Sequence, residues 1–522
     1  MANYPTHKTA RGGDETGSTD EKAASANVED NRPQTVQAPA FIRNLTPGER
    51  QQLEKRLKRK IDARLLPAII IMYIMNYIDR NNIAAARLAG LERDLNLTST
   101  EFQTAVSILF VGYLLMQIPS NLFLNKFGKP AIYLPACMVV WGIISALTAV
   151  CTNAAGLLAN RFFLGVVEAA YFPGCLYYLS CWYTRKELGF RTAVLYSGAL
   201  ISGAFSGLIS AGVTWGMDGT RGLGAWQWLF IIEGAATVVV ALGCYFVLPN
   251  FPRTTKWLNE EEMALAVWRL QEDIGEDDWV NSEQQTFWQG AKLAFTDPKT
   301  YILLVLLFCI VASGTVTNFF PTVVNTLQQG ALSSNGGNNS NVISLLLTAP
   351  PYVLAVIATY LNATHADKTG ERYWHITIPL WIAVAAYIIA ATTTHVAPRY
   401  LSMMLMVPSV YSGFVVALAW ISNTLPRPPA KRAAALAFIN AVSNCSSIYA
   451  SYLYPKSADP QYTVAMIVNC ATAFGAVCAA TVMRVVLVRL NKKLEAGVWV
   501  EGAINNALPG EGGVKNGFRF KV

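Results

Sequence analysis

Residues 160–174 read NRFFLGVVEAAYFPG and place an arginine, Arg161, and a glutamate, Glu168, inside an apolar run. The run is long enough to cross a bilayer, where an isolated charge costs about 2.5 to 3.5 kcal/mol on insertion scales. Because the two residues are seven positions apart, a helix places them on one face, about 10 Å apart along its axis. That face must contact protein or water rather than lipid. An acid at this depth, near a fixed cation, is what a proton-coupled anion carrier requires.

The composition is that of a membrane protein. The 522 residues are 53% hydrophobic and 14% charged, whereas an ordinary soluble domain is about 25% charged. Apolar runs of about 20 residues, the length that crosses a bilayer, recur along the chain. We therefore predict an all-α integral membrane fold of twelve transmembrane helices in two six-helix halves. The expected spans are 65–86, 103–124, 131–151, 157–181, 192–215, 226–249, 299–322, 341–362, 374–392, 399–423, 432–454 and 463–488.

The hydrophilic segments set the expected domain boundaries. Residues 1–45 have the composition of a disordered cytosolic tail. The two halves are expected at 46–249 and 299–490, a cytoplasmic central loop at 250–298 and a cytosolic tail at 491–522. Capping patterns predict helix starts at Thr46, which is followed by Pro47 and Glu49, and at Asp297, which precedes a proline.

The two halves resemble each other in the turn after their second helix. NKFGK at 125–129 follows the second expected span, and ADKTGER at 366–372 follows the eighth. Two repeats with matching turns are how alternating-access carriers are built. We therefore expect gating turns that contain the following residues: Lys126, Gly128, Asp367, Gly370 and Arg372.

Basic residues predict the orientation. They concentrate in alternate short loops, so the positive-inside rule places both termini and the central loop in the cytoplasm. Because these residues lie in short clusters between apolar runs, the net charge of +8 does not indicate nucleic-acid binding.

The nine cysteines lie in or beside apolar runs without metal-binding spacing. No nucleotide-binding or hydrolase motif is present. We expect no enzyme and no cofactor, only a proton gradient as the energy source.

Charged residues in three expected spans are the candidates for the chemistry. Asp79 and Arg80 fall in the outer half of the first span, roughly level with Arg161. An ion pair between Asp79 and Arg161 is geometrically possible and would leave Arg80 free to bind an anion together with Arg161. Glu168, near the midplane, is the expected proton carrier, and Asp79 and Glu233 of the sixth span are further proton-coupling candidates. The alternatives are a permanent structural ion pair of Arg161 with Glu168 or Asp79, and a purely capping or packing role for Glu233.

Polar residues at mid-depth in the second half complete the candidate site. Tyr411 lies in the tenth span, and Asn440 and Asn444 lie four residues apart in the eleventh, so these two share a helix face. We predict that all three contact the substrate. Hydrogen bonding between helices is the alternative explanation. The glycines of the fifth span, among them Gly203 and Gly207, predict close packing between helices.

Four motifs carry a resemblance to a known family. They are YIDRNN at 77–82, RFFLGVVE at 161–168, WYTRKE at 182–187 and WQWLFIIEG at 226–234, and residues 425–454 fit as well. The chain resembles the anion:cation symporter branch of the major facilitator superfamily, and within it the fungal allantoate permease group. Asn125 stands where an Asp is usual in the superfamily, as is common in this group.

The resemblance implies a twelve-helix fold and proton-coupled uptake across the plasma membrane. The implied substrate is a small organic anion, such as a vitamin-like carboxylate, a ureide or a sulfur-containing anion. Arg161 and Glu168 match positions that the wider branch uses for substrate and proton handling. One alternative is an exporter of drugs or secondary metabolites with the same fold, and another is a membrane nutrient sensor that does not transport. We expect a monomer in the lipid bilayer.

Overall fold

The computed structural model describes residues 39–127, 129–255, 257–282, 287–331, 338–425, 429–498, 500 and 519–522. All regular secondary structure in these residues is helical. Their contacts define two units, residues 1–44 and 45–522. The first unit contributes the short helix α2 (Ala40–Arg43). The tail expected at 1–45 therefore lies mostly outside the described residues.

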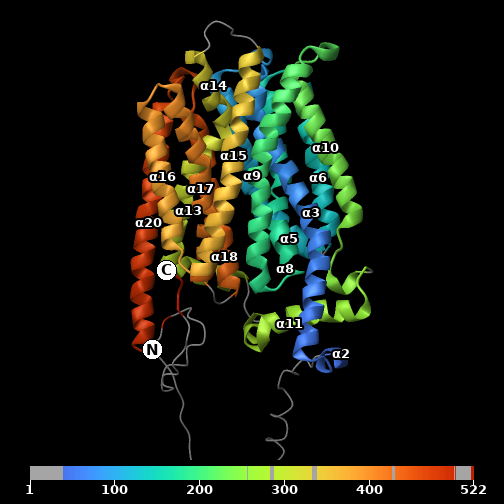
Figure 1. Cartoon of the computed structure of the whole chain (residues 1–522). Helices are drawn as coiled ribbons and strands as arrows, with labels where there is room; N and C mark the ends of the chain where they lie inside the picture. The colour runs from blue at the N-terminus through green and yellow to red at the C-terminus, as the bar shows by residue number, and fades with distance from the viewer. Residues whose placement is uncertain are drawn as a thin grey trace, which may run out of the picture. The chain divides into compact units, whose positions relative to one another are not determined.

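The second unit is a bundle of long helices that follow each other in two sets (Figure 1). Eleven of the helical segments described are long and apolar enough to cross a membrane. The first set is α3 (Pro47–Leu88), α5 (Ser99–Phe127), α6 (Pro130–Leu147), α7 (Ala154–Glu168) with α8 (Tyr171–Ser180), α9 (Arg185–Gly216) and α10 (Ala225–Val247). The second set is α13 (Pro298–Ser313) with α14 (Phe320–Ala331), α15 (Asn338–Thr369), α16 (Tyr373–Thr392), α17 (Val396–Thr424), α18 (Pro429–Asn444) with α19 (Ser446–Ala450), and α20 (Thr463–Glu495). The predicted all-α integral membrane fold is confirmed.

The segment expected as one span at 432–454 is divided. Helix α18 ends at Asn444, and the shorter α19 and a 3-10 turn, Ser451–Leu453, follow it. The side-chain amide of Asn444 donates to the backbone oxygen of Asn440 at 2.8 Å. Such side-chain bonds offer backbone groups partners outside the regular helix ladder. Because α18 has 16 residues and α19 has 5, the segment is not among the eleven long helices.

The first helix is longer than the apolar run predicts. The expected capping box is confirmed, because the Thr46 side chain accepts from the Glu49 backbone and the Glu49 side chain accepts in return. The polar start of α3, from Pro47, contacts α11 (Glu260–Ser282) of the central loop, which lies across it in Figure 1. Lys60 of α3 pairs with Glu262 of α11 at 2.6 Å. Burial raises the pKa of Glu262, but the hydrogen bonds from Lys60 and from the Asn259 backbone, together with the nearby positive charges, outweigh burial and leave this pKa below its ordinary value.

The two halves pack directly against each other through α9 and α15. A Cβ atom added to Gly207 of α9 would lie 2.2 Å from the Thr348 hydroxyl of α15 and 2.8 Å from the backbone oxygen of Leu345. Only glycine therefore allows the two helices to approach this closely. Further links between the halves join Thr104 to Tyr452 at 3.0 Å and the amide of Asn341 to the backbone oxygen of Leu88 at 3.0 Å.

Candidate functional site

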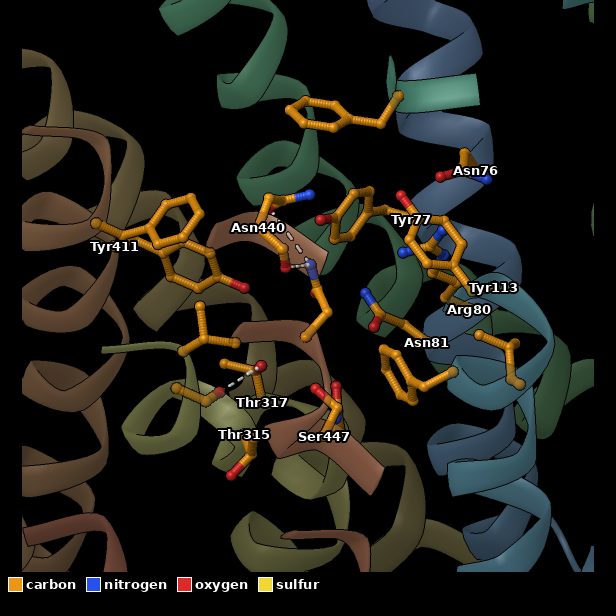
Figure 2. A pocket seen from close by; sticks show the side chains of 18 of the residues that line it. Asn76, Tyr77, Arg80, Asn81, Tyr113, Thr315, Thr317, Tyr411, Asn440 and Ser447 are labelled. Atoms are coloured by element: carbon orange, nitrogen blue, oxygen red, sulfur yellow. Dashed lines mark hydrogen bonds between the residues drawn. The ribbon is translucent and has the colours of Figure 1, made fainter. Parts of the chain in front are cut away.

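A cavity of about 140 Å³ lies between the two halves. Helices α3, α5 and α7 line one side, and α13, α17 and α18 line the other. In Figure 2 the side chains of Arg80, Tyr77 and Tyr113 face those of Tyr411 and Asn440 across this space. All five side chains predicted to contact a substrate line the cavity, namely Arg80, Arg161, Tyr411, Asn440 and Asn444. The structure thus brings together residues from four separate parts of the sequence.

Arg80 and Glu168 form an ion pair at the wall of this cavity. The Nε of Arg80 lies 2.5 Å from Oε2 of Glu168, and the side chains are 15% and 0% exposed. The Arg80 guanidinium also lies over the Tyr113 ring, 4.5 Å from its centroid, a geometry in which the ring face attracts the cation. Oε1 of Glu168 has no hydrogen-bond partner in the described part of the protein.

Arg161 is buried and incompletely bonded. Its side chain is 1% exposed, and its Nη2 donates to the backbone oxygen of Arg80 at 3.4 Å. Its Nε and Nη1 find no partner among the described residues. The pairing with Asp79 that the sequence allowed is therefore not formed, and Arg161 keeps two buried donors without partners at the cavity.

Asp79 points away from the cavity into the first half. Its two carboxylate oxygens accept from Ser145 at 2.8 Å and from Thr237 at 2.9 Å. Because consecutive residues of an α-helix point about 100° apart, Asp79 and Arg80 cannot share a face. Glu233, 3% exposed, lies on α10 behind them, and neither of its oxygens has a hydrogen-bond partner within the described ranges. Neither carboxyl group lines the cavity.

Two breaks in helices shape the site. Helix α7 ends at Glu168, and the fourth span resumes with α8 at Tyr171. Pro173 lacks the N–H that the backbone oxygen of Ala169 would accept in a continuous helix. Gly165 fixes α7 against α5, because a Cβ there would lie 2.0 Å from the backbone oxygen of Leu109.

The second break lies in the seventh span. Residues Gly314–Phe319 form a 3-10 helix between α13 and α14. The Thr317 hydroxyl bonds the Gly314 backbone oxygen at 2.8 Å, and Pro321 lacks the N–H that would bond the backbone oxygen of Thr317. Irregular backbone at membrane depth is tolerated where it lines a cavity, and Gly314, Thr315, Thr317 and Asn318 do line this one.

Sequence reasoning missed part of the lining. The missed polar and aromatic residues include Asn76, Tyr77, Asn81, Tyr113, Tyr196, Thr315, Thr317, Asn318 and Ser447. A signal for two of them was present, because Asn76 and Tyr77 lie four and three residues before Arg80 and so share its helix face. The polar cluster at 313–318 inside an apolar run was a second signal.

The expected gating turns are described only in part. Gly128 lies outside the described residues, and only the backbone of Lys126 is described, at the end of α5. In the second-half turn, Nη2 of Arg372 donates to Asp367 at 2.6 Å. Gly370 has a φ of +74°, a conformation that glycine adopts without steric cost. Asp367 and Arg372 therefore close this turn as a unit.

Asp297 anchors the start of the second half. It caps α13, as predicted, through a bond from the Lys299 backbone at 2.9 Å. Its carboxylate also lies 2.8 Å from Nζ of Lys431, at the start of α18. Burial raises the pKa of Asp297, but the hydrogen bond from Lys431 and the Lys299 charge outweigh burial and hold it below its ordinary value.

A multi-pass helical bundle with a polar, charged cavity between two halves defines a membrane transporter. Residues 69–451 match the sequence model of the Major Facilitator Superfamily. The chain belongs to this family.

Several relatives match over most of their length. The MFS-type transporter cnsO of Penicillium expansum is 32% identical over 453 residues, which cover 84% of this chain and 84% of the relative. A putative tartrate transporter of Agrobacterium vitis is 32% identical over 396 residues, 75% of this chain and 86% of the relative. The solved structure of the xylose transporter XylE from E. coli, in a partially occluded inward-open conformation, aligns with a TM-score of 0.58 at 15% identity. It covers 78% of this chain and 96% of XylE, and it shows the shared fold.

Proposed function

We propose that the protein is a proton-coupled symporter that takes up a small organic anion across the plasma membrane. We place it in the anion:cation symporter branch, in the allantoate permease group, with a vitamin-like carboxylate, a ureide or a sulfur-containing anion as substrate. A relative named as a putative tartrate transporter supports an anionic substrate, because tartrate is a dicarboxylate. No cofactor is needed beyond the proton gradient.

The observation that carries this proposal is the ion pair of Arg80 and Glu168 beside the unpaired donors of Arg161. Arg80 and Arg161 supply two guanidinium groups at one cavity, and Glu168 is an internal carboxylate that already occupies one of them. A substrate carboxylate that enters must compete with Glu168 for Arg80. Guanidinium groups suit this task because their planar donors match a carboxylate.

Competition for Arg80 couples the anion to a proton. Two carboxylates about 4 Å apart repel each other by about 4 kcal/mol at the effective dielectric constant of about 20 that describes protein sites. Substrate therefore enters at lower cost when Glu168 carries a proton. Protonation also frees Arg80 from its internal partner. Anion and proton then bind together and are released together, which is symport.

Asp79 and Glu233 act behind the cavity as further proton-coupling groups. An ionised carboxylate buried without partners is strongly unfavourable, so we infer that Glu233 is neutral in the state described. Asp79 lies close enough to interact electrostatically with both Glu168 and Glu233. A change of charge at Glu168 therefore changes the electrostatic energy of Asp79. A proton bound to Asp79 or to Glu233 compensates for the negative charge that Glu168 gains when it loses its proton.

The halves alternate around this site with both termini in the cytoplasm. The central helix α11 contacts the start of α3, and the positive-inside rule places this end of the bundle in the cytoplasm. The contacts of Thr104 with Tyr452 and of Asn341 with Leu88 join the halves at the opposite end. These contacts must separate when the cavity opens to the outside.

Uptake of labelled compounds by transporter-deficient yeast tests the proposal. The panel contains nicotinate, pantothenate, biotin, allantoate, a sulfonate and a neutral amino acid, each at outside pH 5 and pH 7.5. We expect accumulation of one anion, stronger at pH 5 and abolished by a protonophore. Absence of uptake for every compound, with the protein shown to be at the cell surface, would favour either an exporter or a substrate outside this panel.

A further inference from the structure

A second cavity, of about 370 Å³, lies away from the first, where the sixth span leaves the membrane. It is formed by α3, by the end of α10 and by the segment that follows α10. Its lining residues are Arg64, Leu248, Pro249, Asn250, Thr254, Thr255 and Trp257. The apolar helix α10 ends at Val247, so this cavity lies at the boundary between the membrane and water.

The cavity presents polar groups that lack partners. Nε of Arg64 donates to the backbone oxygen of Val247 at 2.9 Å, and the guanidinium lies 5.0 Å from the centre of the Trp257 ring. Within the part of the chain that the structure describes, three buried polar atoms have no hydrogen-bond partner: Asn250 Oδ1, Thr255 Oγ1 and Trp257 Nε1. A buried polar group without a partner is unfavourable, because it has lost its hydrogen bonds to water. A ligand that supplies both acceptors and a donor would satisfy all three.

The chemistry of these groups selects the ligand. The indole N–H of Trp257 and the hydroxyl of Thr255 donate, and Arg64 adds positive charge, which together suit the oxygens of a phosphate. The amide oxygen of Asn250 only accepts, so it requires a donor such as a hydroxyl group on the same ligand. A phosphate that carries a hydroxylated substituent meets both requirements.

Exposed apolar side chains lie at the end of α10, next in sequence to the cavity residue Leu248. The residues just before Leu248 are among the exposed large apolar side chains, with Tyr245 49%, Phe246 80% and Val247 41% exposed. In a transmembrane helix these side chains contact lipid chains. Tryptophan is also enriched at this depth, where its ring lies among lipid headgroups. A molecule with a polar head in the cavity and apolar chains along α10 therefore fits both surfaces.

We propose that this cavity binds the headgroup of an anionic phospholipid that carries a free hydroxyl, such as phosphatidylglycerol or phosphatidylinositol. The phosphate lies against Arg64, Trp257 and Thr255, the headgroup hydroxyl donates to Asn250, and the acyl chains lie along the last turn of α10. Because α3 and the start of the central loop both contribute to the cavity, a bound lipid joins these two segments.

Native mass spectrometry of the purified full-length protein with defined lipids tests this site. We expect phosphatidylglycerol and phosphatidylinositol to bind at least tenfold more tightly than phosphatidylcholine. The Arg64→Gln variant should lose this preference. Arg253→Gln, which removes an equal charge at an exposed position beside the cavity, should keep it. Trp257→Phe retains the ring and loses the N–H, so it should weaken anionic lipid binding severalfold while the protein remains folded.

Two results would overturn the proposal. One is equal binding of anionic lipids by the wild-type protein and the Arg64→Gln and Trp257→Phe variants. The other is binding of soluble glycerol 3-phosphate as tight as that of phosphatidylglycerol, which would identify a free phosphate ester rather than a lipid as the ligand. Because the site is separate from the central cavity, neither result depends on which solute the protein transports.

Discussion

Arg80 and Glu168 are direct ion-pair partners across two helices, with Nε of Arg80 2.5 Å from Oε2 of Glu168. The pair lies at the cavity between the two halves, and only the arginine lines that cavity. The internal carboxylate therefore occupies the cation that a substrate anion needs. This relationship connects proton binding with substrate binding.

The Glu168→Gln variant should bind and exchange substrate without accumulating it. The amide has the same size as the carboxyl group but cannot be protonated and deprotonated during the transport cycle. We expect counterflow exchange to persist while uphill accumulation at outside pH 5 falls to the level at pH 7.5. Glu261→Gln, at an exposed position of α11, serves as the control and should accumulate normally. Unchanged accumulation in Glu168→Gln would exclude its role in coupling.

The Arg80→Ala variant should lose transport and also fold poorly, because it leaves the carboxylate of Glu168 buried without its cation. Adding Glu168→Gln to Arg80→Ala removes that buried charge. We therefore expect the double variant to recover cell-surface expression but not uptake. Measurement of surface protein and uptake on the same cells separates folding from binding. Normal uptake by Arg80→Ala would show that Arg80 does not contact the anion.

The Arg161→Lys variant should bind substrate more weakly while it keeps the positive charge. A lysine lacks the planar fork that binds a carboxylate through two donors. We expect KM to rise about tenfold, which corresponds to about 1.4 kcal/mol, with a smaller change in maximal rate. Arg93→Lys changes an arginine whose side chain is 83% exposed and should leave KM unchanged. Full affinity in Arg161→Lys would argue against bidentate recognition.

The sequence predicted the fold and the identity of many cavity residues, but not their pairing. Charges inside apolar runs identified Arg80, Arg161 and Glu168, because such charges are costly in lipid. The choice of partner depends on how α3 and α7 are rotated, which depends in turn on packing between helices. Asp79 shows this clearly. It points to Ser145 and Thr237 rather than to Arg161, and neither hydroxyl residue stands out in the sequence.

Helix breaks were the other limit of sequence reasoning. The run around 299–322 reads as one apolar span, yet its backbone changes to a 3-10 helix at Gly314–Phe319. Mean hydropathy averages over such a segment and does not detect a local change in hydrogen bonding. The Thr317 hydroxyl bonds the Gly314 backbone oxygen inside this segment, and Pro321 lacks the N–H that would continue the α-helical bonding. The polar wall that this segment gives the cavity followed only from the structure.

The Glu233→Gln variant separates a proton-coupling role from a packing role. Because neither oxygen of Glu233 has a hydrogen-bond partner in the described structure, a neutral amide of similar size should preserve the melting temperature. We expect accumulation at pH 5 to fall, by less than in Glu168→Gln. In the matched variant Asp79→Asn, an NH2 group replaces one of the two carboxylate oxygens that accept from the Ser145 and Thr237 hydroxyls. This variant should therefore lower the melting temperature in addition to reducing accumulation. Wild-type accumulation by Glu233→Gln would assign this residue to packing alone.

The Asp297→Asn variant tests the electrostatics outside the membrane. Asp297 joins α13 to α18 through Lys431, which is 2% exposed, and loss of the carboxylate removes one charged partner of this buried lysine. We expect the variant to lose about 2 kcal/mol of stability at pH 7, the usual contribution of a hydrogen bond to a charged group, measured by thermal unfolding of the purified protein.

The pH dependence of this loss follows from the lowered pKa of Asp297. A carboxylate with a lowered pKa in the folded state stabilises the protein above its ordinary pKa of about 3.8, and this contribution disappears as the pH falls through the lower value. The difference between wild type and Asp297→Asn should therefore be constant from pH 7 to pH 5 and shrink below about pH 4. Lys292→Gln, on the neighbouring helix α12 (Phe287–Thr296), should show no such pH-dependent difference. A difference for Asp297→Asn that stays constant down to pH 3 would mean that the cap geometry, and not the charge, holds α13 to α18.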